Sequence, residues 1–147
     1  MTFDRWVDQE LVPVRVLKLQ LHMIARGIAY IHQQEMAHRD IKAANIVLME
    51  NMVPNIIDFG MVEHNINSKQ PISSKCGTPG YMAPEMDDGD NHDRHIDLTK
   101  VDSWALGVLI YYSLFQRMPF HTEHKWTKPY SRPDICFTPP HLAVVGT

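Results

Sequence analysis

The sequence predicts a mostly helical α+β domain with one short β-hairpin, and three features carry this prediction. An apolar stripe through residues 17–31 has helical spacing. Two β-rich runs, residues 46–49 and 53–57, are separated by a short polar turn. Residues 101–115 are apolar nearly all round a helix, which predicts burial on every side. The 147 residues suffice for one domain or one large part of a domain.

The first long helix is predicted to begin near Pro13 and to end near Gln34. Proline suits a first helical turn, where its missing N–H is not needed. Apolar residues then recur at steps of four and three: Leu17, Leu21, Ile24, Ile28 and Ile31. Core packing explains this stripe without any functional role. Residues 1–10 are mixed in character and are predicted to form a short helix.

The hairpin places a polar side chain at each of its ends. Asn45 precedes the first run and Asp58 follows the second, so the turn should bring the two together. Pro54 suits only a strand start or a sheet edge. Residues 61–76 are polar and are predicted to form a loop, and the histidine- and proline-rich residues 121–147 an irregular tail.

Composition argues against several classes of protein. The formal net charge of −3 and the pI near 6.3 show no excess of positive charge of the kind that nucleic-acid-binding proteins carry. The longest apolar run, residues 104–112, is far shorter than the ~20 residues of a membrane span. The amino terminus is too charged for a signal peptide, and Cys76 and Cys136 make no disulfide framework. We therefore expect an intracellular protein, cytoplasmic or nuclear, with neither nucleic acid nor membrane as partner.

The nine histidines raise the alternative of a small metal-binding protein. His92 and His95 are spaced by three residues, as are His121 and His124. A structural zinc site uses four regularly spaced ligands, usually including thiolates, and neither cysteine is close to these pairs. The acidic stretch 87–93 fits no calcium-loop register. A solvated loop explains these residues better.

Four short motifs in a fixed order hold the residues best suited to chemistry: His38-Arg39-Asp40, Asn45, Asp58-Phe59-Gly60 and Ala83-Pro84-Glu85. Phosphoryl transfer needs one carboxylate that faces the attacking hydroxyl, and a second carboxylate with an amide to hold magnesium. Asp40 and Asn45 stand five apart on one loop and can supply one group for each task. The hairpin returns Asp58 to the same place.

This order of motifs resembles the eukaryotic-type protein kinases of the serine/threonine class, over roughly residues 1–120. The resemblance implies a kinase-like fold in incomplete form: a mostly helical C-terminal lobe with a hairpin around the catalytic loop, and no N-terminal lobe. The family's Gly-rich loop and strand lysine occur nowhere in the sequence. We expect residues 1–120 to be a partial catalytic domain, followed by the tail 121–147.

The resemblance also implies the roles of the site residues. Asp40 would be the catalytic base, and Asn45 with Asp58 would coordinate Mg²⁺. Lys42 would contact the γ-phosphate of ATP, and Thr78 would hydrogen-bond Asp40 and Lys42. An ordinary exposed lysine is the alternative for Lys42.

Two further site features follow from the same resemblance. Val47 would form the floor beneath the adenine of ATP. Arg39 is typical of kinases that are switched by phosphorylation of their own loop, and Ser73 and Ser74 lie in the matching window. Ordinary solvated serines are the alternative there.

Structural roles are implied for five residues: His38, Phe59, Gly60, Glu85 and Asp102. Core packing explains His38 and Phe59 equally well. Glu85 would pair with an arginine, for which Arg132 is a candidate. Asp102 would bond the backbone of the catalytic loop, or would be a simple acid near a helix N-terminus.

The function expected from these residues is that of a protein serine/threonine kinase, which uses Mg²⁺ and ATP to phosphorylate protein substrates and is inactive as this chain alone. The alternative is a non-catalytic, pseudokinase-like interaction module. An apolar surface left without its usual neighbours would invite a covering partner. A fragment, a truncated isoform and a partial gene model all fit the sequence.

Overall fold

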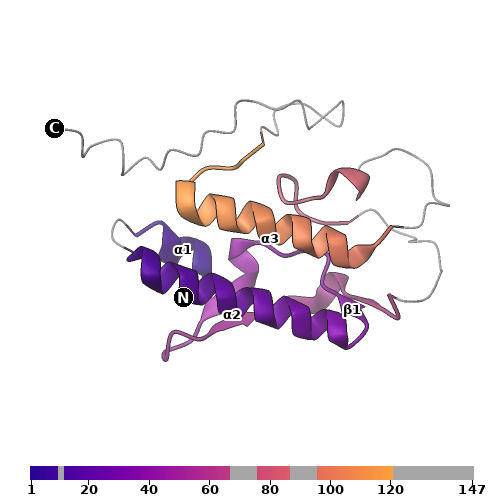
Figure 1. The fold of residues 1–147 in the computed structure, drawn as a ribbon, viewed down its shortest axis with the longest axis horizontal. Coiled ribbons are helices and arrows are strands. Elements are labelled where there is room, and N and C mark those ends of the chain that lie inside the picture. The colour runs from indigo at the N-terminus through magenta and orange to yellow at the C-terminus, as the bar shows by residue number, and fades with distance from the viewer. Residues whose placement is uncertain (10–11, 67–75, 87–95, 121–147) are drawn as a thin grey trace.

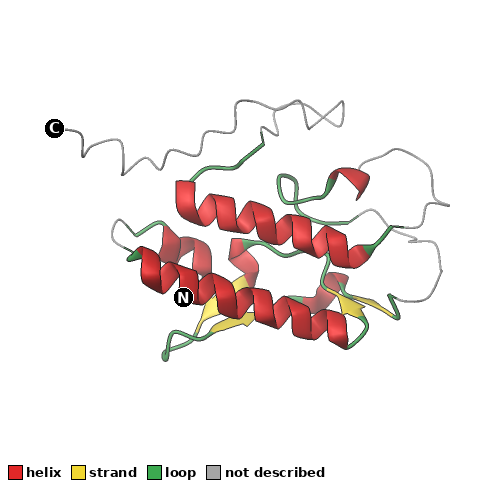
Figure 2. Cartoon of the chain, viewed as in Figure 1, coloured by secondary structure: helices red, strands yellow, loops and turns green. Residues whose placement is uncertain are grey.

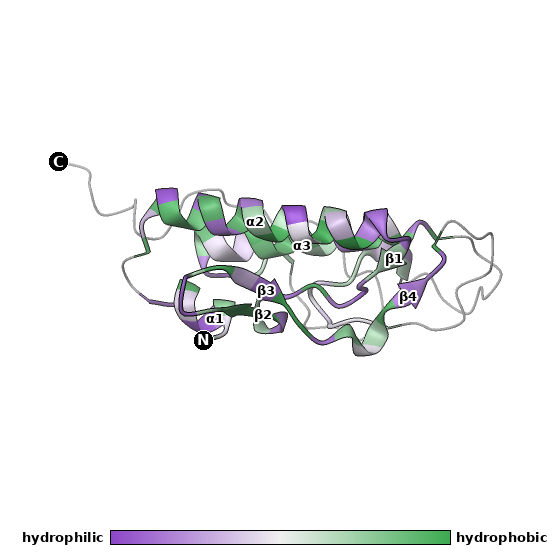
Figure 3. Ribbon diagram, turned by 90° about the horizontal axis from the view of Figure 1, so that it is seen from below, coloured by the Kyte–Doolittle hydropathy of each residue, from purple (hydrophilic) through white to green (hydrophobic). Residues whose placement is uncertain are grey.

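The computed structural model describes residues 1–9, 12–66, 76–86 and 96–120 (Figure 1). Two long helices, α2 (Val14–Gln33) and α3 (Leu98–Phe115), lie side by side and run in opposite directions. The hairpin and the short helix α1 (Phe3–Val7) lie against one side of this pair (Figure 3). The predicted tail, both histidine pairs, Ser73, Ser74 and Arg132 fall outside the described residues.

The helix α2 matches its prediction closely. Pro13 is its N-cap residue, and Gln34 follows its last turn. All five apolar residues of the predicted stripe are buried: Leu17, Leu21, Ile24, Ile28 and Ile31. Gln20 is buried beside them, and its Nε2 donates to the carbonyl of Met52 at 2.8 Å, which ties the helix to the hairpin turn.

The predicted hairpin is present, and Figure 2 shows it beside a second small sheet. Strand β2 (Ile46–Leu48) pairs antiparallel with β3 (Pro54–Ile56), and Pro54 is the first residue of its strand. The second sheet pairs β1 (Met36–Ala37) with β4 (Glu63–His64). The sequence predicted a loop at residues 61–76, so the strand β4 corrects that prediction.

Three short 3₁₀ turns complete the described structure: η1 (Ala43–Asn45), η2 (Phe59–Met61) and η3 (Pro84–Met86). The turn η1 leads directly into β2, and η2 lies between β3 and β4. The loop that begins at His38 therefore runs from the end of β1 to η1. Among the described residues, no helix is long and apolar enough to cross a membrane.

The helix α3 begins earlier than predicted and is less buried than predicted. Its N-cap is Asp97, whose Oδ1 accepts from the backbone N–H of Thr99 at 3.1 Å, so the helix starts at Leu98 rather than near residue 101. Ser103 and Gly107 are exposed, and a side chain at Gly107 would meet no atom within 4 Å. The described residues therefore cover one face of α3 and leave another open, which corrects the expectation of burial on every side.

Two apolar clusters form the core of the described structure. The larger joins α1, α2 and the hairpin to the middle of α3, where Leu109 is fully buried. The smaller packs Ala37 and Ala83 against the first turns of α3. In the view coloured by hydropathy, hydrophobic and hydrophilic stretches alternate along α2 (Figure 3). Large apolar side chains remain exposed on the described surface at Ile57, Phe59 and Met61.

Replacing Leu109 by Ala should lower the free energy of unfolding by about 2–5 kcal/mol, because it leaves a cavity where α1, α2 and α3 meet. Leu19→Ala is the matched control, since Leu19 is 63% exposed on α2 and its loss should change stability by less than about 0.5 kcal/mol. Urea unfolding followed by circular dichroism measures both. Equal effects of the two substitutions would contradict the described core.

Candidate active site

The carboxylate of Asp102 fixes the loop that carries the site. Asp102 is 0% exposed, and its Oδ1 accepts from the backbone N–H of Arg39 at 2.8 Å. Its Oδ2 accepts from the backbone N–H of His38 at 2.8 Å and lies 2.9 Å from Nε2 of His32. Hydrogen bonds to an ionised acceptor are strong, and a buried carboxylate needs such donors. Asp102 lies inside α3 and bonds the loop, so it is not a simple acid at the helix N-terminus.

Two N–H groups reach one carboxylate because the loop turns sharply at Arg39. Its φ is +65°, a left-handed conformation that residues other than glycine seldom adopt. The strain of such a conformation persists only where surrounding contacts hold it. Here the two bonds to Asp102 hold the turn that immediately precedes Asp40.

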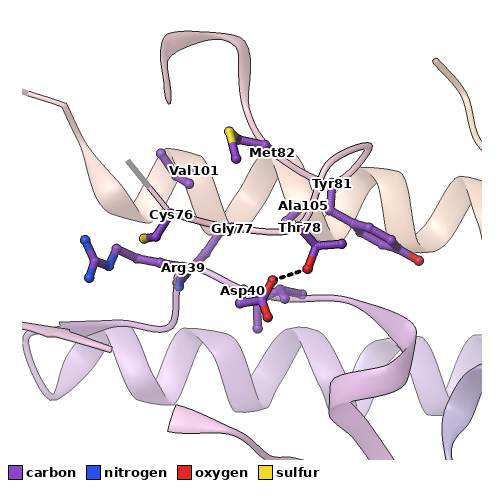
Figure 4. A pocket seen from close by; sticks show the side chains of 11 residues that line it. Arg39, Asp40, Cys76, Gly77, Thr78, Tyr81, Met82, Val101 and Ala105 are labelled. Atoms are coloured by element: carbon purple, nitrogen blue, oxygen red, sulfur yellow. Dashed lines mark hydrogen bonds between the residues drawn. The ribbon is translucent and has the colours of Figure 1, made fainter. Parts of the chain in front are cut away.

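Asp40 lies at the centre of a closed set of hydrogen bonds. The Nζ of Lys42 donates to Asp40 Oδ2 at 2.8 Å and to Thr78 Oγ1 at 2.7 Å. The hydroxyl of Thr78 donates to Asp40 Oδ1 at 2.6 Å, as the dashed line in Figure 4 shows. Asn45 Nδ2 donates to Asp40 Oδ2 at 3.0 Å and to the Asp40 carbonyl at 2.9 Å. The structure therefore brings together four of the residues that the sequence singled out.

These contacts determine the charge of Asp40. Burial alone raises the pKa of a carboxyl group, and it is the largest single influence on Asp40. The combined hydrogen bonds of Lys42, Thr78 and Asn45 and the charge of Lys42 outweigh it, so the pKa of Asp40 lies below its ordinary value. The side chain is an ionised carboxylate at neutral pH and can accept a proton.

Asp58 stands apart from this set of hydrogen bonds. Its φ is +63°, and its Oδ1 accepts from the backbone N–H of Gly60 at 3.4 Å. The preceding residue, Ile57, donates its N–H to the carbonyl of Asn45 at 2.9 Å, so the backbones of the two segments are adjacent. The Asp58 side chain is exposed and bonds neither Asn45 nor Asp40. The backbone at Asp58 therefore lies close to Asn45, while the Asp58 carboxylate stays outside the Asp40 network.

The oxygen atoms near this turn suit a divalent cation. Both hydrogen bonds of the Asn45 side chain use its nitrogen, so within the described structure its Oδ1 bonds no other residue. The Asp58 carboxylate is accessible. No group of three or more His, Cys, Asp or Glu residues that could hold a metal occurs among the described residues. A site with only one amide and one carboxylate suits Mg²⁺. This ion usually keeps several water ligands and also binds substrate phosphates, so it does not need a cage made of protein ligands alone.

His38 links the loop to the turn at Asp58. Its ring is fully buried and meets the ring of Phe59 edge to face, at a centroid distance of 5.0 Å. The backbone N–H of Asp40 donates to Nδ1 at 3.3 Å, so Nε2 carries the proton and donates to the carbonyl of Ile57 at 3.0 Å. Phe59 itself is partly exposed, so its contact with His38 does not bury it.

The segment 76–86 covers the loop from the side of α3. At Gly77 the φ is +125°, and a Cβ there would lie 3.3 Å from the Arg39 carbonyl, so a larger residue would be strained and crowded against the loop. This contact sets Thr78 over Asp40 (Figure 4). Cys76 is half-buried here, and burial raises the pKa of its thiol. Glu85 is half-buried, and its predicted partner Arg132 lies outside the described residues.

Sequence reasoning missed two residues that matter to the geometry. His32 contacts Asp102, and Glu63 lies 3.4 Å from the guanidinium of Arg39. The position of His32 near the end of a helix gave no sign of a partner 70 residues away. The role of Glu63 depends on the two-residue pairing of β1 with β4, which is too short to leave a period in the sequence. Val47, the predicted floor of the adenine site, is half-buried on β2 opposite Asn55.

Comparison with known proteins agrees with this geometry. The family model described as "Protein kinase domain" matches residues 2–136. The probable serine/threonine-protein kinase CCRP1 of Zea mays is 33% identical over 141 residues, 95% of this chain and 22% of that protein. Aurora kinase A-B of Xenopus laevis is 39% identical over 105 residues, 71% of this chain and 24% of that protein. The serine/threonine-protein kinase plk-1 of Caenorhabditis elegans is 34% identical over 102 residues, 69% of this chain and 15% of that protein.

The chain therefore spans less than a quarter of each of these relatives. The family match covers more than half of the chain, and the similarity includes both the helices and the loop that carries Asp40. On this evidence the chain belongs to the protein kinase domain family, as a domain of the eukaryotic serine/threonine type.

Proposed function

We propose that the chain is the phosphate-transferring part of a protein serine/threonine kinase, which moves the γ-phosphate of ATP to hydroxyl groups of protein substrates. Residues 1–120 would form the partial catalytic domain, its C-terminal lobe, and residues 121–147 a tail. One observation carries the proposal: an ionised Asp40 that is held by Lys42, Asn45 and Thr78. A carboxylate in this state suits the acceptance of a proton from an alcohol.

The contact between Thr78 and Asp40 supports the role of Asp40 as the base. A threonine hydroxyl already donates to Asp40 Oδ1 at 2.6 Å, so this oxygen can receive an O–H donor of the class that the enzyme would phosphorylate. A substrate hydroxyl would approach the same carboxylate. The ammonium of Lys42, between Asp40 and Thr78, lies where it could offset the charge of a transferring phosphate.

Asn45 and Asp58 would hold Mg²⁺, which neutralises charge on the phosphates of ATP when it is bound. The Asn45 amide is oriented for this by its two bonds to Asp40, which point its nitrogen inward and leave its oxygen for the cation. The backbone next to Asp58 is bonded to that of Asn45, so the exposed Asp58 carboxylate would turn toward the Asn45 oxygen. Val47 would support the adenine from β2.

The chain alone should transfer phosphate poorly. No Gly-rich phosphate loop occurs in the 147 residues, so nothing of that kind would cover the nucleotide. The described surface leaves Ile57, Phe59 and Met61 exposed beside the site, and a partner of the chain could cover them. The same exposure favours the alternative, a non-catalytic interaction module that binds through this surface.

Phosphorylation would regulate this site through Arg39. A phosphate on Ser73 or Ser74 carries about −1.5 to −2 charge and can pair with an arginine. We propose that such a phosphate orders the 61–76 segment. Replacing both serines by Ala should then loosen this segment in hydrogen exchange relative to the phosphorylated chain, and unchanged exchange would argue against the proposal.

The function is tested by transfer from labelled ATP with Mg²⁺ to a generic basic protein, with the chain in excess. Only trace transfer is expected, and Asp40→Asn should reduce it by roughly 10²–10⁴-fold, since general-base catalysis typically contributes that much. Asp4→Asn, at a half-buried aspartate on α1, removes the same charge and should leave transfer unchanged. Transfer that persists in Asp40→Asn would contradict the role of the base, and absence of nucleotide binding would favour the interaction module.

Metal binding can be measured without transfer. Mn²⁺ added with ATP should broaden the NMR signals of the Asn45 side-chain amide and the Gly60 backbone amide, since both lie beside the proposed ligands. Asp58→Ala should abolish this broadening, whereas Asp4→Ala should not. Broadening that is equal in all three chains would place the cation elsewhere.

The pH dependence of stability tests the ionised state of Asp40. Because the pKa of Asp40 is depressed in the folded chain, its contribution is present above the unfolded pKa of about 3.9 and is lost as pH falls through the folded pKa. The difference in unfolding free energy between the natural chain and Asp40→Asn should be constant from about pH 5 to 7 and shrink below about pH 4. Urea unfolding over this range measures it, and a difference that grew on acidification would contradict the assignment.

A further inference from the structure

The guanidinium of Arg39 is nearly buried, with 8% of the side chain exposed, and it has definite partners. Its Nε donates to the carbonyl of Met61 at 2.6 Å. Its Nη1 lies 3.4 Å from Oε2 of Glu63, whose side chain is 42% exposed. A buried cation is costly unless it is paired, so this carboxylate stabilises the position of Arg39.

The backbone sets Glu63 in this place. In the pairing of β1 with β4, Ala37 lies opposite Glu63. Arg39 follows Ala37 by two residues, and a long side chain can reach a diagonal neighbour at that separation. The carbonyl of Met61, two residues before Glu63, accepts from Nε of the same guanidinium. Arg39 therefore ties the catalytic loop to the segment that follows Asp58.

The other acids close to Arg39 are already engaged. Both oxygens of Asp102 accept from the loop backbone, and both oxygens of Asp40 accept from Lys42, Asn45 or Thr78. Glu63 differs from them, because Arg39 is the partner of its carboxylate among the described residues. It is the acid that another anion would have to replace.

We propose that Glu63 is a built-in counter-charge for Arg39 and that it competes with a phosphate group for the guanidinium. In the unmodified chain, Glu63 holds Arg39 and the residues after Asp58 in place. A phosphate dianion can bind Arg39 only by displacing this carboxylate, which repels it. The inference deepens the proposed function, because it rests on Arg39 as the regulatory residue of that site.

Anion binding to the full-length chain tests this inference, with inorganic phosphate and O-phosphoserine as the two probes. Removing the Glu63 charge should remove its repulsion of an anion at Arg39, so Glu63→Gln should bind inorganic phosphate roughly tenfold more tightly than the natural chain. Titration calorimetry gives the affinities. A preference for O-phosphoserine over inorganic phosphate would identify a modified serine as the source, and equal affinity would identify free phosphate.

Two control chains separate this effect from a general change of charge. Glu50→Gln removes the same charge from the exposed hairpin turn and should leave phosphate affinity as in the natural chain. Adding Arg39→Gln to Glu63→Gln should abolish the gain. The inference is overturned if Glu50→Gln and Glu63→Gln bind phosphate equally, or if the natural chain binds it as tightly as Glu63→Gln.

Hydrogen exchange provides a second readout that does not depend on affinity. Backbone amides of residues 62–64 should exchange faster in Glu63→Gln than in the natural chain, and phosphate should restore their protection. Unchanged exchange in both conditions would contradict the proposal. Neither measurement involves ATP. A negative result here would therefore not contradict phosphate transfer by Asp40, and a negative transfer assay would not contradict this inference.

Discussion

A single buried carboxylate, that of Asp102, connects the helical scaffold to the loop that carries Asp40. It accepts two backbone N–H groups of that loop and contacts His32 on α2, so three separate segments meet at one side chain. Buried charges in proteins are stabilised only by such converging donors. The left-handed turn at Arg39, and with it the direction in which Asp40 points, depends on this interaction.

The contacts around Asp40 follow from that turn. The carboxylate of Asp40 bonds Lys42 and Asn45, which follow it within a few residues. The close approach of Gly77 to the loop brings in Thr78 from the segment 76–86. Burial works against the charge of Asp40, and the hydrogen bonds prevail. Asp58 lies outside this network, so the half of the site around Asp40 is preorganised, whereas the proposed metal-binding half would need the Asp58 carboxylate to turn inward.

Much of the fold could be predicted because long periodic segments carry strong signals. The stripe from Leu17 to Ile31 and the hairpin about residues 46–57 were predicted within a few residues. The strand β4 was missed because two residues carry no period, and α3 starts early because Asp97 caps it. Site residues were found by motif order, whereas the partners of Arg39 and Asp102 depend on tertiary contacts that no local pattern records.

The measurement that tests this account most directly is amide hydrogen exchange at His38 and Arg39 after Asp102→Ala. If the carboxylate holds the loop, these two amides should lose their protection while the middle of α2 keeps its own, and Asp102→Asn should show a smaller loss. Protection at both amides that equals that of the natural chain, in a variant that remains folded, would contradict the account.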